Sequence, residues 1–257
     1  MESRKTVYYR TYDEDVVASR DQDLRLPTGY HWYHENPIYR AFAGLVYVLF
    51  VPVAWFYVKC VLRVRVVNRS VLKECRDSGY FLYGNHTQPV GDAFAPGLYV
   101  APKRIRTVAA PSNLGIPLLG KILPLLGALV IPESSGDMKK FLTAMGKYLE
   151  RGNCIVVYPE AHVWPWCSFV RPFPETAFRF PVRFHAPCFC MTTTYQETRW
   201  GKRPRITVYF DGPFYPDEGV KTKEAQHRLH EEIAACMAMR SKNSNCEYIH
   251  YEERTEA

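Results

Sequence analysis

Residues 41–58 form the longest uncharged run of the chain, bracketed by Arg40 and Lys59. As a helix, this run would be about 27 Å long, slightly shorter than the roughly 30 Å hydrocarbon core of a bilayer. Pro52 predicts a kink, and aromatic residues gather near both ends, as is typical of a membrane interface. The run favours a membrane-associated helix, which either spans the bilayer or lies in its interface, over the alternative of a buried core helix.

Basic residues are concentrated directly after this run. The chain carries a formal net charge of +7, and residues 59–76 hold a single acid, Glu74, against Lys59, Arg63, Arg65, Arg69, Lys73 and Arg76. Such a segment is attracted to anionic headgroups by about 1 kcal/mol per charge. We therefore expect a phospholipid membrane as partner and no nucleic acid, and the positive-inside bias predicts that the following domain faces the cytoplasm.

The N-terminal and cysteine patterns indicate the same compartment. The first thirty residues are polar and lack the apolar core of a signal peptide. The eight cysteines contain no C-x-x-C pair, and several stand in apolar, strand-like runs. We expect reduced core thiols in a protein whose bulk is cytosolic.

Beyond residue 60, strand-like runs alternate with segments of helical periodicity. The strand-like runs lie at 62–67, 80–83, 105–109, 128–131, 154–158, 187–195 and 205–210. The clearest helical segments run from Asp137 to Arg151, with Ser134 or Ser135 as possible cap, and from Lys221 to Arg240. The alternation predicts an α/β fold with a largely parallel sheet flanked by helices. We expect residues 1–60 to hold a polar segment and the membrane-associated helix, and residues 61–257 to form the α/β domain.

Residues 114–132 are also apolar but contain five helix breakers. Because Gly115, Pro117, Gly120, Pro124 and Gly127 interrupt it, a continuous membrane helix is not expected there. Short helical turns fit this pattern, with their leucines facing either a lipid chain or the protein core.

The segment from Tyr80 to Phe94 has the strongest chemical signal. An apolar strand ends at Gly84, a polar turn follows with His86, and Asp92 stands where it can cap an apolar helix. Strand ends and helix starts gather ligands in parallel sheets. A carboxylate at Asp92 can orient the His86 imidazole and leave its other nitrogen free to accept a proton. The alternative is a capping Asp beside an unrelated loop His.

A second polar group follows a later strand. The run from Cys154 to Tyr158 is apolar and ends in Pro159-Glu160. Glu160 is placed to bind a substrate hydroxyl or to orient a basic group, and the alternative is a solvated loop acid.

Together these segments resemble the glycerolipid acyltransferase family, which includes 1-acylglycerol-3-phosphate acyltransferases. That family carries, in order, the motifs NHxxxxD, GxxFIxR and FPEGTR and a later proline-containing strand. The corresponding places here hold Asn85-His86 to Asp92, Gly127 to Ile131, Tyr158-Pro159-Glu160 and Ala186 to Phe189. The resemblance covers roughly residues 60–212 and implies that the α/β domain is catalytic and that residues 41–58 bind the membrane.

The departures from the family pattern concern the acceptor. Five residues, rather than four, separate His86 from Asp92. Glu133 stands at the place of the second motif's arginine, and residues 161–163 replace the Gly-Thr-Arg of the third. In the family those arginines are thought to hold the acceptor phosphate, a contact that Glu and Val cannot make. The candidates for a substitute are Arg171, Arg179, Lys139 and Lys140, although solvated surface charges are the simpler interpretation for most of them.

The resemblance implies transfer of a fatty acyl group from acyl-CoA or acyl carrier protein to a hydroxyl of a lysophospholipid or related lipid acceptor. His86 would be the general base, Asp92 would orient it, and nearby backbone N–H groups would stabilise the oxyanion. Asn85, Glu160 and Arg171 would bind substrate. No metal and no cofactor beyond the acyl donor is expected.

Two other functions remain open from the residues alone. One is a metal-dependent hydrolase that uses His86, Asp92, Glu160 and His162 as mixed nitrogen and oxygen ligands. The other is a catalytically silent membrane adaptor that keeps the same fold, which the missing arginines make plausible.

Overall fold

The computed structural model describes residues 5–17, 24–199 and 203–254. In these segments the main sheet has seven strands, in the order β2 (Arg65–Val67), β8 (Arg205–Phe214), β7 (Cys188–Gln196), β3 (Tyr80–Gly84), β6 (Cys154–Val157), β4 (Ile105–Ala109) and β5 (Ala128–Val130). Neighbours run parallel except for the antiparallel pair β7 and β8. The predicted α/β fold with a largely parallel sheet is confirmed, and each predicted strand is present.

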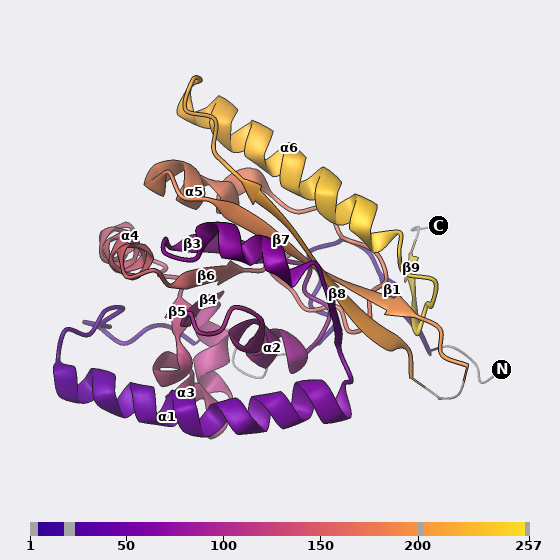
Figure 1. Cartoon of the computed structure of the whole chain (residues 1–257), viewed down its shortest axis with the longest axis horizontal. Coiled ribbons are helices and arrows are strands. Elements are labelled where there is room, and N and C mark those ends of the chain that lie inside the picture. The colour runs from indigo at the N-terminus through magenta and orange to yellow at the C-terminus, as the bar shows by residue number, and fades with distance from the viewer. Residues whose placement is uncertain (1–4, 18–23, 200–202, 255–257) are drawn as a thin grey trace.

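Helices cover both faces of this sheet (Figure 1). One face carries α4 (Ser135–Glu150), α5 (Arg179–Phe184) and α6 (Thr222–Ser241), and the other carries α1 (Pro37–Phe56), α2 (Gly91–Tyr99) and α3 (Leu119–Leu126). The central strand β3 contributes side chains to the cores on both faces of the sheet. Phe81 and Tyr83 pack in the core beneath α4, α5 and α6, and Tyr80 and Leu82 pack in the core on the side of α2. A strand covered on both sides is apolar throughout, which explains the unbroken apolar run that predicted it.

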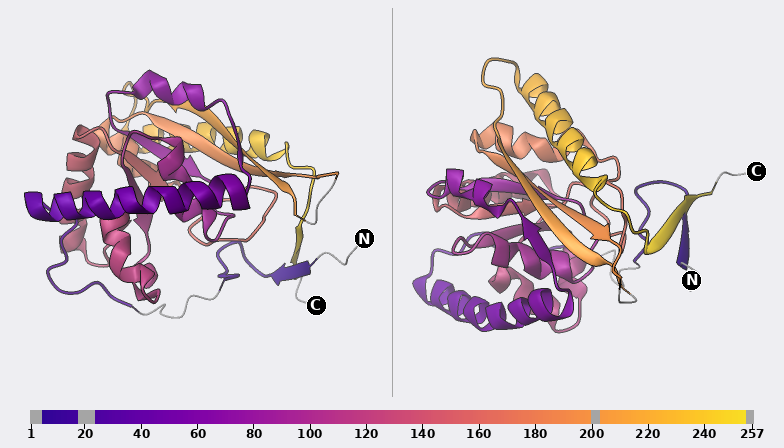
Figure 2. Two further views of the ribbon diagram at one scale, coloured as in Figure 1. Left: turned by 60° about the horizontal axis from the view of Figure 1, so that its bottom comes forward. Right: turned by 45° about the vertical axis from the view of Figure 1, so that its right-hand side comes forward.

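The helix predicted at 41–58 is α1, and it begins four residues earlier than expected. The side chain of Asn36 caps it by accepting hydrogen bonds from the backbone N–H groups of Ile38 and Tyr39. A π-helical turn, Tyr57–Val61, continues α1 beyond Pro52 without a break in the helix. The helix packs along α2 and α3 (Figure 2), yet only Ala43 and Ala54 within it are buried. The alternative of a buried core helix is therefore wrong.

The apolar segment 114–132 is broken, as its glycines and prolines predicted. It forms a 3-10 turn (Pro111–Gly115), then α3 and β5. Gly127 ends α3 with a φ of +113°, and a β-carbon there would lie 2.4 Å from the carbonyl oxygen of Ile105. Only glycine satisfies both conditions, so this residue sets the tight passage from α3 into the sheet.

A small second sheet, which the sequence patterns did not indicate, joins the two ends of the chain. Strand β1 (Lys5–Tyr9) pairs in parallel with β9 (Ile249–Glu253). The pair packs on Trp164, whose ring stacks on Tyr251, and it projects from one side of the molecule (Figure 2). The N-terminal segment, which had been expected only to be polar, is thus attached to the loop that follows β6.

Candidate active site

The candidate site lies at the carboxyl end of β3, where the chain turns into α2. Gly84 ends the strand, and a β-carbon there would lie 2.9 Å from the ring of Tyr158 and 3.0 Å from Met191. The absence of a side chain at Gly84 allows the turn with His86 to pass close to the neighbouring strand ends. His86 is about a quarter exposed, at 23%, whereas Asp92 is 6% exposed.

The turn brings His86 and Asp92 together. The Nδ1 atom of His86 lies 2.8 Å from Oδ2 of Asp92. The same carboxylate oxygen accepts hydrogen bonds from the backbone N–H groups of Thr87 and Gln88, each at 2.9 Å. A carboxylate oxygen is an acceptor, so Nδ1 carries the proton and Nε2 is left as the accepting nitrogen of the neutral ring. The extra residue between His86 and Asp92 is accommodated within this turn.

Asp92 does not occupy the predicted capping position. The helix α2 begins at Gly91 with Val90 as its N-cap, and Asp92 lies in the first turn, where a negative charge is also favourable. The carboxylate instead closes the turn that precedes the helix. The N–H of His86 donates to Oε2 of Glu160, and those of Thr87 and Gln88 donate to Asp92. These three backbone N–H groups are therefore not free to stabilise an oxyanion. The expected backbone donors for the oxyanion are thus not found in this turn.

Tyr158 supports the His86 ring. The two rings stack with centroids 4.5 Å apart and an interplanar angle of 20°, and the Tyr158 hydroxyl donates to the backbone oxygen of Asp92 at 2.8 Å. From the sequence, Tyr158 was expected at the end of a strand and at the start of the third family motif, without a role of its own. Its position directly before Pro159, at the carboxyl end of a central strand, was the available signal.

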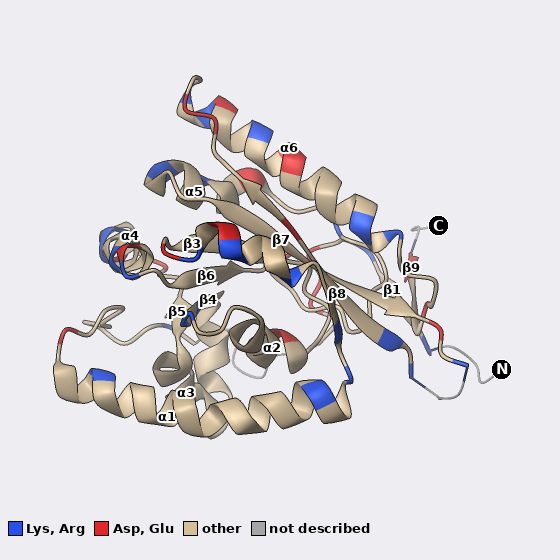
Figure 3. Ribbon diagram, viewed as in Figure 1, with Lys and Arg blue, Asp and Glu red and all other residues tan. Residues whose placement is uncertain are grey.

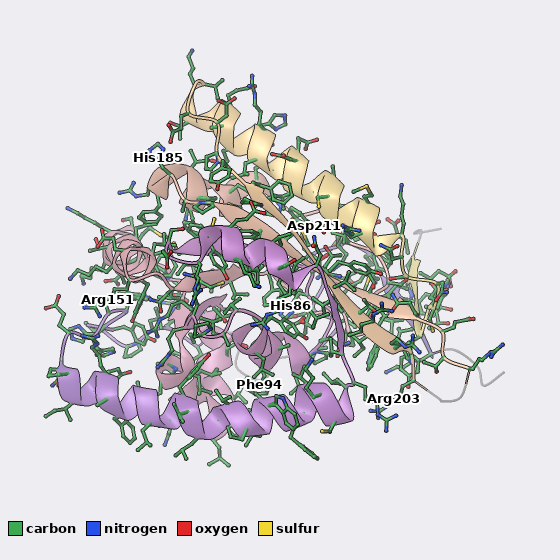
Figure 4. The ribbon with its side chains drawn as sticks, in the orientation of Figure 1. His86, Phe94, Arg151, His185, Arg203 and Asp211 are labelled. Carbon is green, nitrogen blue, oxygen red and sulfur yellow. The ribbon has the colours of Figure 1, made fainter. Side chains whose placement is uncertain are left out.

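An apolar cavity of about 280 Å³ opens beside His86. Its walls come from α1, α2, α3 and β4, and include Phe50, Phe94, Ile105, Leu123 and Leu126. Polar groups on its wall include His86 and Asp92, with Tyr158 beside them. Figure 4 shows His86 and Phe94 near the middle of the molecule, above α1. The geometry thus joins a proton-accepting group to a space suited to an apolar chain.

Asn85, Glu160 and Arg171 lie inside the protein, at 1%, 4% and 1% exposure. Asn85 exchanges two hydrogen bonds with the backbone of Thr193. Glu160 accepts from the N–H groups of His86 and Arg171 and pairs with the Arg171 guanidinium at 2.9 Å. These residues hold together the loops next to His86 and are not among the residues that line the apolar cavity. Glu160 orients a basic group, which was one of its two predicted roles, and it is not a solvated loop acid.

The other basic candidates for a phosphate contact belong to a different part of the fold. Lys139 and Lys140 lie on α4 and Arg179 on α5, the helices on the sheet face opposite α1 and α2. Lys140 pairs with Asp137 at 2.9 Å. The structure thus does not bring them to His86.

The four residues of the hydrolase hypothesis do not form a common site. The Nδ1 atom of His162 lies 2.9 Å from Oδ1 of Asp15 in the N-terminal segment. The Glu160 carboxylate forms an ion pair with Arg171. Within residues 5–17, 24–199 and 203–254, no group of three or more His, Cys, Asp or Glu side chains has the arrangement of a metal site. The donor set therefore does not support the metal-dependent alternative.

Comparisons with known proteins agree with the fold and the motifs. The family model described as Acyltransferase matches residues 63–193, more than half of the chain. The crystal structure of PlsC from Thermotoga maritima, a 1-acyl-sn-glycerophosphate (LPA) acyltransferase, has a similar fold. The TM-score is 0.53 at 15% sequence identity, and the match covers 79% of this chain and 93% of that chain. No curated protein matches the sequence significantly. On the family match over residues 63–193, which include His86, Asp92 and Glu160, the chain belongs to the acyltransferase family and is an acyltransferase enzyme.

Proposed function

We propose that the protein transfers a fatty acyl group from an acyl thioester, carried by coenzyme A or acyl carrier protein, to a hydroxyl of a lysophospholipid or related lipid acceptor. The observation that carries this proposal is the His86–Asp92 pair at the wall of an apolar cavity. The Thermotoga protein with a similar fold is named for acylating 1-acyl-sn-glycerophosphate, which supports a glycerolipid acceptor and a role in phospholipid biosynthesis.

His86 acts as the general base in this mechanism. Its Nε2 accepts the proton of the acceptor hydroxyl while the hydroxyl oxygen attacks the thioester carbonyl carbon. Asp92 holds the ring in the required tautomer and stabilises the imidazolium. The tetrahedral intermediate then collapses, the carbon–sulfur bond breaks, and the thiolate leaves with the proton from the imidazolium. The products are the ester and a free thiol, without a covalent enzyme intermediate or a cofactor.

The apolar cavity holds the acyl chain in this proposal. Its walls are aliphatic and aromatic, so each methylene that moves there from water gains about 0.8 kcal/mol. Its volume of about 280 Å³ is near the lower limit of roughly 300 Å³ for small-molecule sites. A single chain therefore suits it better than a two-chain lipid.

The outer face of α1 is the proposed membrane contact. Ile38, Val48 and Leu49 are 78%, 64% and 66% exposed, and the helix and its π-helical extension, Pro37–Val61, are long and apolar enough to cross a membrane. Charge on this helix is confined to Arg40 near one end and Lys59 near the other (Figure 3). Because its other side packs on α2 and α3, we propose that α1 lies in the interface on the cytoplasmic side, with the cavity directly above the lipid.

Acyl transfer by the purified protein tests the proposal. The protein is mixed with acyl-CoA, and separately with acyl carrier protein loaded with the same chain, in phosphatidylcholine vesicles that contain a panel of lysophospholipids. We expect a diacyl product and an equal amount of free thiol, and neither with His86→Ala. Thiol release without acylated lipid in the presence of every acceptor would contradict transfer to a lipid. No turnover of either donor by a folded, vesicle-bound wild type would contradict the proposal.

A further inference from the structure

A second large cavity lies at the opposite end of the parallel strands from His86. His86 follows the carboxyl end of β3, whereas this cavity is lined at the amino ends of the parallel strands β4 and β6, at the start of α1 and at the end of α4. Its volume is about 590 Å³. Figure 4 shows Arg151, one of its lining residues, above the first turns of α1 and away from His86.

The lining of this cavity is strongly basic. Four arginines contribute to it, namely Arg40, Arg104, Arg106 and Arg151, and we call it the arginine cavity. The other titratable residues of its lining are His31, His34, Tyr30, Tyr33, Tyr39 and Tyr148. No aspartate or glutamate is among its described lining residues. Glu35 lies just outside this lining; Lys147, and to a lesser extent Arg151, lower the pKa of its carboxyl group.

The guanidinium groups in the arginine cavity have rings as neighbours instead of acceptors. The Cζ atom of Arg104 lies 4.1 Å from the ring centre of Tyr47, and that of Arg106 lies 3.9 Å from the ring centre of Tyr148. The Nε atoms of both arginines are buried without a hydrogen-bond partner in the described part of the chain. Each guanidinium has five N–H donors, and at least one buried donor of each of these two arginines is unused.

This arrangement is costly without an anion. Burial lowers the pKa of Arg104 and of Arg106, and the positive charge of Arg104 lowers the pKa of Arg106 further. A cation over an aromatic ring gains about 0.5–2 kcal/mol, whereas removing an ion from water costs several kcal/mol. Arg104 and Arg106 are only partly buried, so only part of this cost applies to them; the stacking on Tyr47 and Tyr148 offsets some of it, and a bound anion would offset more.

The wall of the arginine cavity is held in place before any ligand binds. Trp32 donates from Nε1 to the backbone oxygen of Val130 at 2.6 Å, and its own backbone oxygen accepts from the Tyr148 hydroxyl at 3.0 Å. His34 stacks on Tyr39 with ring centres 3.8 Å apart. A site fixed in this way loses little conformational freedom on binding.

We propose that the arginine cavity binds a phosphate group, as a monoester or diester, through Arg104, Arg106 and Arg151. Planar guanidinium groups match phosphate oxygens through pairs of hydrogen bonds, and a phosphate monoester offers more charge and more acceptors than a carboxylate. The proposal concerns the edge of the sheet opposite His86 and does not depend on acyl transfer.

Two sources of phosphate fit this position. The cavity includes Pro37, Arg40, Ala41 and Ala43 at the start of α1, next to the apolar residues Ile38 and Phe42 on the outer face of that helix. The headgroup of an anionic phospholipid can therefore approach it from a bilayer. A soluble phosphate ester can approach it from water, and its organic part would lie among the aromatic rings.

The test measures binding of two probes to the full chain. Isothermal titration with glycerol 3-phosphate reports a soluble ester. Co-sedimentation compares vesicles of phosphatidylcholine with vesicles of an equal mixture of phosphatidylcholine and phosphatidic acid, and so reports a headgroup. The variant is Arg104→Gln with Arg106→Gln. The charge-matched control is Arg183→Gln with Arg199→Gln, which removes two exposed arginines outside the arginine cavity.

We expect the variant to weaken binding of at least one probe by about tenfold or more, since hydrogen bonds between charged groups are worth about 1.5–3 kcal/mol. The control should bind like the wild type. A loss confined to glycerol 3-phosphate identifies a soluble ester, and a loss confined to the phosphatidic acid vesicles identifies a headgroup. Equal affinity of variant and wild type for both probes, or an equal loss in the control, would overturn the proposal.

A second measurement needs no variant. Thermal unfolding of the wild type is followed in sodium phosphate and in sodium chloride at equal ionic strength, because a ligand that binds only the native state raises Tm. In parallel, the NMR titration of His34 is recorded, whose pKa is lowered by burial, by His31 and by Arg106. We expect phosphate to raise both Tm and the pKa of His34. Identical values in the two salts would also overturn the proposal.

Discussion

The buried pair of Glu160 and Arg171 gives the sharpest prediction about how the candidate site is built. In addition to its 2.9 Å contact with Glu160, the Arg171 guanidinium donates to the backbone oxygens of Tyr12 and His162 and lies 4.7 Å from the ring centre of Trp164. Arg171→Met removes all of these contacts and leaves the Glu160 carboxylate buried. Removing one partner of a buried ion pair costs about 3–5 kcal/mol. This is a large part of a typical stability of about 5–15 kcal/mol.

Urea unfolding followed by tryptophan fluorescence measures this loss. The double variant Glu160→Gln with Arg171→Met should be less destabilised than the sum of its single variants, by about 1–3 kcal/mol, because the second change removes the unpaired charge. Arg183→Met, at an exposed position of α5, is the matched control and should lie within about 0.5 kcal/mol of the wild type.

Kinetics distinguish a structural role from a contact with substrate. If Arg171 only holds the loop, the KM for the lipid acceptor stays near the wild-type value under conditions in which the variant is folded. If Arg171→Met instead keeps wild-type stability and raises that KM about tenfold, Arg171 contacts the acceptor and the reasoning above is wrong.

Three further predictions concern other parts of the molecule. Asp92→Asn should lower kcat by about 10³–10⁴-fold, because the amide favours the wrong tautomer of His86; a loss below tenfold in a steady-state assay would contradict this. Gly97→Ala places a methyl group 3.0 Å from the Tyr47 hydroxyl, on the wall of the apolar cavity, and so narrows the cavity. It should therefore shift the preference among acyl-CoA donors toward shorter chains, whereas an unchanged chain-length profile would place the chain elsewhere. The pKa of His34 is lowered, so at this residue the unfolded state binds more protons than the native state. The wild type should therefore lose stability relative to His34→Gln as the pH falls through about 6.5. Urea midpoints of the two proteins that differ by the same amount across this pH range would refute this prediction.

Much of the fold could be predicted because the central strands are covered on both sides. Tyr80 to Tyr83 and Cys154 to Val157 are buried throughout, so each stands out in the sequence as an apolar run. The pairing of β1 with β9 left no such signal. Its partners are more than two hundred residues apart, and only Tyr9 and Tyr251 within the two strands are buried.

The part of the candidate site that could be predicted consists of reactive residues that lie close together in the sequence. His86 and Asp92 are separated by a short turn, so their contact followed from spacing and from the family resemblance. For Glu160 the sequence predicted either contact with a substrate hydroxyl or orientation of a basic group, and it did not identify Arg171 as that group, because the same residue types serve equally in a binding site and in a buried ion pair. Only their burial and their backbone partners decide between these roles.

The arginine cavity was even harder to predict from the sequence. Arg104 and Arg106 stand at the start of β4 and Arg151 at the end of α4, and in sequence each is indistinguishable from a solvated surface charge. Their convergence depends on the register of β4 beside β6 and on the position of α1. Sequence periodicity specifies neither of these.

The central claim is that His86 drives acyl transfer, and the most direct test is the single-turnover rate of acyl-CoA consumption with a saturating lysophospholipid acceptor. The comparison is between the wild type and His86→Ala, both shown to bind vesicles and to unfold with the same urea midpoint. General base catalysis contributes about 10²–10⁴-fold, so we expect the variant to be slower by at least about 10²-fold. A rate for His86→Ala within threefold of the wild type would contradict it.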